Sequence, residues 1–127
     1  GSLDPSKELE ARNLYWDVVS RGDVKAGEES KTAITTLYRA SELNPYIAEP
    51  HIVRAQLLLD LESYEEAQTS AEEALRLFCE WGTPWDKRMG WGAWVAWSRM
   101  LAQRAESKTP WPKDTWGVMN LGLVHQP

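Results

Sequence analysis

The chain has 127 residues, of which 43% are hydrophobic and 26% charged, and its formal net charge at pH 7 is −5. This composition is typical of one soluble domain and excludes a fibrous or disordered chain, and a chain of this length can form a core without disulfides or metal. The single cysteine, Cys79, excludes an internal disulfide and favours a reducing compartment, so we expect an intracellular, cytoplasmic protein, with an organelle left open.

The N-terminus carries no recognisable targeting signal. Gly1-Ser2 resembles an expression scar, and residues 1–4 are interpreted as scar and leader. No apolar run approaches the roughly 20 residues that a bilayer crossing needs, so we expect no membrane partner.

Two helices are predicted before residue 44. The first, marked by Leu14, Val18 and Val19 with a turn at Gly22-Asp23, is irregular and requires about six inserted residues around positions 24–30. The second spans about residues 28–43 and ends at Asn44-Pro45, because proline cannot continue a helix. Its apolar positions fall at helical spacing: Ala33, Ile34, Leu37, Ala40 and Leu43.

A second pair of helices is predicted between residues 50 and 79. Pro50 suits a first helical turn, and the residues that follow are apolar almost all round, which is typical of a helix buried on two sides. After a short break at residues 61–64, an amphipathic helix follows. Its apolar face comprises Tyr64, Ala67, Ala71, Ala74, Leu75 and Phe78.

The two helix pairs repeat with a period of 34 residues. At that offset Ala33 falls on Ala67, Ala40 on Ala74, Leu43 on Leu77 and Pro50 on Pro84. Alanines seven residues apart lie on one helical stripe, where a neighbouring helix can approach closely.

This period resembles that of the tetratricopeptide repeat family, whose 34-residue units are helix-turn-helix hairpins. The family's small or apolar positions are matched within residues 48–79 by Ala55, Leu58, Tyr64, Ala67 and Ala74. The resemblance covers roughly residues 10–80. It implies an all-α fold of antiparallel helical hairpins in a short right-handed solenoid, with two hairpins over residues 5–80.

The C-terminal third differs from the rest in charge and composition. Residues 1–80 hold 8 basic and 16 acidic side chains, whereas residues 81–127 hold 6 basic and 3 acidic ones and seven of the eight tryptophans. Thr83-Pro84 is typical of a helix start, and Asp86 in a first turn suits the helix dipole. We therefore predict one long tryptophan-rich helix within residues 81–106 that caps the solenoid, followed at 107–127 by a non-helical strap or linker.

No residue pattern indicates catalysis. His51, His125 and Cys79 lack the spacing of metal ligands or of a catalytic pair, and the glutamate pairs at 65–66 and 72–73 are typical of a solvated helix face. We predict no catalytic residue, no cofactor and no metal site, and expect a non-catalytic protein-binding or assembly module.

The resemblance implies a concave groove lined by the first helix of each hairpin. The matching residues here are Glu49, Ile52, Gln56, Leu59, Asp60, Asp86 and Trp94. This acidic and apolar lining predicts a basic or apolar partner segment, and Gln56 replaces the asparagine of family members that clamp acidic termini. The alternative that Ile52, Leu59 and Trp94 are simply buried stays open.

Other classes of function remain as alternatives. Basic residues interleaved with indoles in the last third could bind single-stranded RNA, although the acidic first part of the chain argues against it. Those residues are Arg88, Arg99, Arg104, Lys108 and Lys113 with Trp91, Trp97 and Trp111. Carbohydrate stacking on exposed indoles, association of two copies, and an adaptor role beside an enzyme in a longer chain are the others.

Overall fold

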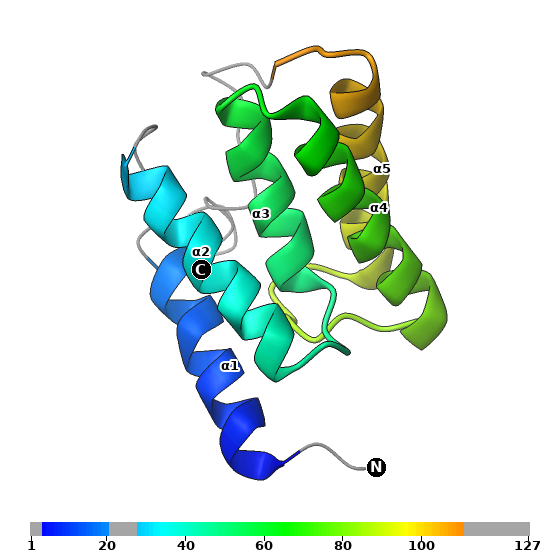
Figure 1. Cartoon of the computed structure of the whole chain (residues 1–127). Helices are drawn as coiled ribbons and strands as arrows, with labels where there is room; N and C mark the ends of the chain where they lie inside the picture. Colours follow the sequence, from blue (N-terminus) through cyan, green and yellow to red (C-terminus); the bar gives the residue numbers. More distant parts are fainter. Residues whose placement is uncertain (1–3, 21–27, 111–127) are drawn as a thin grey trace.

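The computed structural model describes residues 4–20 and 28–110, which form five α-helices and no strand (Figure 1). The helices in chain order are α1 (Pro5–Val19), α2 (Glu28–Leu43), α3 (Glu49–Asp60), α4 (Tyr64–Trp81) and α5 (Trp91–Glu106). The prediction of an all-α fold is thereby confirmed for the described part of the chain. None of these helices is long and apolar enough to span a bilayer.

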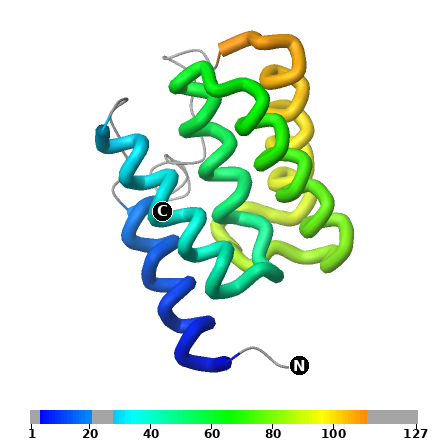
Figure 2. The backbone as a smooth tube through the Cα atoms, in the orientation of Figure 1, coloured from blue at the N-terminus to red at the C-terminus, as the bar shows by residue number. Residues whose placement is uncertain are grey.

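Successive helices run in opposite directions and pack against one another, as the tube in Figure 2 shows. α3 lies between α2 and α4, whereas α5 covers α4 and also touches α3. Ten of the twelve residues of α3 are buried, which agrees with the apolar pattern that predicted a helix covered on two sides.

The helix ends follow from local sequence. Before α1, the Asp4 carboxylate accepts from the Ser6 backbone N–H at 2.9 Å, which satisfies one of the free donors of the first turn. After α2, the Asn44 side chain accepts from the Tyr46 N–H at 3.1 Å. α4 ends at Gly82, whose φ of 69° is a left-handed conformation that glycine adopts without steric cost.

The repeating alanines lie in the core. Ala33, Ala40, Ala67 and Ala74 are each at most 1% exposed, so the neighbouring helices approach closely at these positions. The tryptophan-rich helix α5 adds the largest buried side chain, Trp94, whose ring stacks on Phe78 with the centroids 5.7 Å apart. Burial of an indole of this size contributes several kcal/mol relative to leaving it in water.

The predicted start of the capping helix is wrong. α5 begins at Trp91 instead of Pro84, and residues 82–90 form a non-helical segment, here called the α4–α5 loop. The backbone N–H groups of Trp85 and Asp86 donate to a distant carboxylate, that of Glu49. Because that carboxylate satisfies donors that the first turn of a helix would leave free, the loop conformation is held by tertiary contacts that override the Thr83-Pro84 signal.

Two predicted features lie outside the described residues. These are the turn at Gly22-Asp23 and the part of the strap that follows Pro110. Residues 107–110 are described and are not helical.

Candidate functional site

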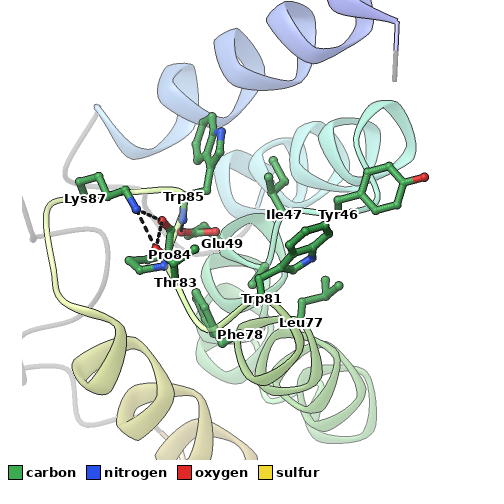
Figure 3. A pocket seen from close by; sticks show the side chains of 11 residues that line it. Tyr46, Ile47, Glu49, Leu77, Phe78, Trp81, Thr83, Pro84, Trp85 and Lys87 are labelled. Carbon is green, nitrogen blue, oxygen red and sulfur yellow. Dashed lines mark hydrogen bonds between the residues drawn. The ribbon is translucent and has the colours of Figure 1, made fainter. Parts of the chain in front are cut away.

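A pocket of about 340 Å³ opens at one end of the helix bundle (Figure 3). It lies where the α2–α3 connection (residues 44–48), the last turn of α4 and the α4–α5 loop meet. Its walls include the apolar side chains of Ile47, Leu77, Phe78 and Pro84. A concave apolar surface of this kind binds an apolar group.

Two large aromatic side chains stand exposed at the pocket. Trp81 is 55% and Tyr46 49% exposed, and their rings meet edge to face with the centroids 6.3 Å apart. Tryptophan and tyrosine are the residues most enriched among those that dominate binding energy at protein interfaces. An adjacent exposed pair beside an apolar pocket therefore marks the strongest candidate binding surface in the described part of the chain.

The wall formed by the α4–α5 loop is fixed by Glu49. One oxygen of this carboxylate accepts from the backbone N–H groups of Trp85 and Asp86, each at 2.6 Å. Burial raises the pKa of Glu49 above its ordinary value, although the hydrogen bonds from backbone N–H groups oppose the shift and nearby Asp86 adds to it. The loop is thereby tied to the first turn of α3.

Asp86 ties the same loop to α1 and α5. Its carboxylate accepts from the Tyr15 hydroxyl at 2.6 Å and from the Arg88 guanidinium at 2.6 to 3.1 Å, and its carbonyl accepts from the Trp94 indole at 3.0 Å. Burial, reinforced by the charge of Asp86, raises the pKa of Tyr15 well above 10, so the hydroxyl remains a donor. The loop is therefore a fixed wall of the pocket.

Cations from α1 and the loop also stack on indoles. The guanidinium of Arg12 lies 5.0 Å from the Trp85 ring centroid, and that of Arg88 lies 4.9 Å from the Trp16 ring centroid. Contacts of this kind contribute about 0.5–2 kcal/mol each, according to how far they are desolvated. They hold α1 against the loop on the side of Trp85 that adjoins Tyr15.

Lys87 is the basic side chain that lines the pocket. Its ammonium donates to the Thr83 hydroxyl at 2.9 Å and to the Pro84 carbonyl at 2.5 Å, both neutral oxygens. Among the described residues it forms no ion pair with a carboxylate. The pocket therefore carries one positive charge that these residues do not neutralise.

The residues predicted to line a concave groove are mostly inside the protein. Six of the seven are buried, namely Glu49, Ile52, Gln56, Leu59, Asp86 and Trp94. Glu49 and Asp86 turn inward because they hold the α4–α5 loop, and Trp94 donates to that loop. The seventh, Asp60, is exposed at the end of α3, and desolvation of its carboxyl raises the pKa to about 6.

Sequence reasoning missed Tyr46, Trp81 and Lys87. Tyr46 follows the Asn44-Pro45 break and Trp81 ends α4, so each belongs to a chain segment between repeats that the family pattern leaves unassigned. The available signal was two aromatic residues at successive hairpin ends, 35 positions apart, close to the repeat period.

A second polar cluster joins α2, α3 and α4 around Arg54. The guanidinium donates to the hydroxyls of Ser41 and Ser70 at 3.2 Å and contacts Nδ1 of His51, and it lies 3.9 Å from the Tyr38 ring centroid. Burial, with a smaller contribution from Arg54, lowers the pKa of His51 to about 4, so this imidazole is neutral at pH 7. The cluster joins three helices and leaves His51 no role as a ligand or base at neutral pH.

The remaining hollow is polar. It measures about 590 Å³ and lies at the α3–α4 turn, where Glu62, Glu65, Glu66 and Lys108 contribute to its lining. Within residues 4–20 and 28–110 no three His, Cys, Asp or Glu side chains lie close enough together to hold a metal ion.

The residues of the RNA alternative do not form one exposed stripe. Trp97 is buried, Trp91 donates its indole N–H to the Phe78 carbonyl at 2.6 Å, and Arg88 pairs with Asp86. Trp111 and Lys113 lie outside the described residues.

Comparison with protein-family models, with curated proteins and with solved structures finds no match to this chain.

Proposed function

We propose that this protein is a non-catalytic protein-binding or assembly module of tetratricopeptide-like hairpins, and that it binds a partner segment at the pocket between Tyr46, Trp81 and the α4–α5 loop. The antiparallel order of the helices and the buried alanines at a 34-residue period support the hairpin part of the proposal. The observation that carries the binding part is the exposed pair Trp81 and Tyr46 beside an apolar pocket.

The size and lining of the pocket suit a side chain presented by another chain. A volume of about 340 Å³ lies at the lower end of the range for small-molecule sites. The exposed rings of Trp81 and Tyr46 extend the apolar surface beyond the pocket itself, where they would cover the backbone of a bound segment. Burial of one large apolar side chain there would contribute about 1.5–3 kcal/mol.

The concave surface implied by the family resemblance is a less accessible location. The α4–α5 loop engages Glu49, Asp86 and Trp94, so only Asp60 of the seven predicted residues is exposed. A partner bound there would have to displace the loop, whereas the pocket is open without such a change. The pocket is therefore the preferred site of this proposal.

Selection from a random 12-residue peptide library displayed on phage tests the proposal. Wild-type protein is the bait, and the double variant Tyr46→Ala/Trp81→Ala is compared with Leu9→Ala, which removes a side chain of similar exposure (57%) from α1, a helix that contributes no residue to the pocket. We expect selected peptides to bind wild type and Leu9→Ala equally and to bind the double variant at least tenfold more weakly. Equal binding to all three proteins, or no enrichment, would contradict the proposal.

A further inference from the structure

We infer that the pocket selects a partner segment in which a bulky apolar residue stands next to a side-chain carboxylate. This inference rests on the proposed function and specifies the chemistry of the partner. It reverses the sign of charge that the sequence predicts, since the acidic lining in the sequence favours a basic segment.

The first step of the argument removes the acidic groups from the recognition surface. Glu49 and Asp86 are each 1% exposed. Two backbone N–H groups of the loop donate to Glu49, and Tyr15 and Arg88 donate to Asp86. Because their oxygens are engaged inside the protein, neither carboxylate is presented to a basic partner.

The second step concerns the charge that remains. Lys87 is exposed, lines the pocket and donates only to neutral oxygens among the described residues. An ammonium has three N–H donors, and the Thr83 hydroxyl and Pro84 carbonyl engage two of them. The third donor and the uncompensated charge are complementary to a carboxylate on the bound segment.

The third step places the two features relative to each other. In Figure 3 Lys87 and Tyr46 lie at opposite edges of the lining, with Pro84 and Trp81 between them. An apolar side chain seated against Trp81 and Phe78 would leave the next residue of the segment facing Pro84 and Lys87. Apolar contacts would therefore supply most of the affinity, and the charge would set the choice between partners.

The test uses three short synthetic peptides, acetylated at the N-terminus and amidated at the C-terminus so that no terminal charge interferes. Each has a Gly/Ser background around a central Trp-Glu, Trp-Gln or Trp-Lys pair, and binding is followed from ¹H–¹⁵N spectra of the protein. At low salt we expect the Trp-Glu peptide to bind about two- to fivefold more tightly than the Trp-Gln peptide, with the Trp-Lys peptide weakest. This preference should diminish at high salt, because an exposed ion pair is screened.

Two charge-reversal variants complete the test. Lys87→Glu should invert the order so that the Trp-Lys peptide binds best, whereas Arg99→Glu, the same change of charge on an exposed position of α5 outside the pocket, should preserve the wild-type order. The comparison of the three peptides on wild-type protein needs no variant, so the inference stays testable if Lys87→Glu alters the loop. Equal affinity of wild type for all three peptides would overturn the inference and leave the proposed function standing. Absence of any response at Trp81 and Tyr46 would overturn both.

Discussion

Replacement of Asp86 by asparagine tests whether the α4–α5 loop is a fixed wall of the pocket. Asp86 is 1% exposed, and its carboxylate is the ion-pair partner of Arg88, whose side chain is 21% exposed. Removal of one partner of a fully buried pair costs about 3–5 kcal/mol. Since Arg88 keeps some contact with water and asparagine can still accept from Tyr15, we expect Asp86→Asn to lower the free energy of unfolding by about 2–3 kcal/mol.

Urea denaturation followed by far-ultraviolet circular dichroism measures this loss. The matched control is Glu80→Gln, which removes the same charge from an exposed carboxylate paired with Arg76 at 2.8 Å. Both side chains of that pair are more than half exposed, so this change should cost less than about 1 kcal/mol. An Asp86→Asn variant as stable as Glu80→Gln would refute the view that Asp86 holds the loop in place.

Three further predictions concern titration, packing and exposure. Because the pKa of His51 falls from 6.5 to about 4 on folding, its contribution to stability is complete above pH 6.5 and is lost as the pH falls through 4, up to about 3 kcal/mol; urea denaturation of His51→Gln at pH 7 and 4.5 should show a smaller loss than wild type, and an unchanged loss would contradict the assignment. Ala67→Leu should destabilise the protein by about 1–3 kcal/mol through overpacking while Ala96→Leu on the exposed face of α5 should not, and equal melting temperatures would argue against a close seam at Ala67. Trp94→Ala should cost about 3–5 kcal/mol and Trp81→Ala less than about 1 kcal/mol, a ranking that chemical denaturation would reverse if Trp81 were a core residue.

The helices that the sequence predicts well are those that local signals define. The helix expected over about 28–43 is α2, Glu28–Leu43, because apolar periodicity marks its length and Asn44-Pro45 stops it. The helix expected from Tyr64 begins at that residue, since the short polar break before it is visible in the sequence. In both segments the local preference and the packing agree.

The start of α5 and the location of the pocket depend on contacts between distant residues. Thr83-Pro84 is a sound local start signal, but Glu49, more than 30 residues earlier, binds the N–H groups that follow it. The inward orientation of Glu49 and Asp86 depends on the same contacts, so their charges could not be assigned to the interior from sequence. Tyr46 and Trp81 come together only because two connections meet at one end of the bundle.

Mapping of a selected peptide onto the protein by ¹H–¹⁵N spectra tests the account most directly. The indole N–H signals of Trp81 and Trp94 are assigned by single tryptophan-to-phenylalanine substitutions, and the backbone signals of Tyr46 and Lys87 report on the rest of the pocket. We predict that the peptide shifts the signals of Trp81, Tyr46 and Lys87 and leaves the buried Trp94 indole unchanged. Shifts centred on Asp60 and the exposed face of α5, with Trp81 and Tyr46 unaffected, would contradict the assignment of the pocket as the binding site.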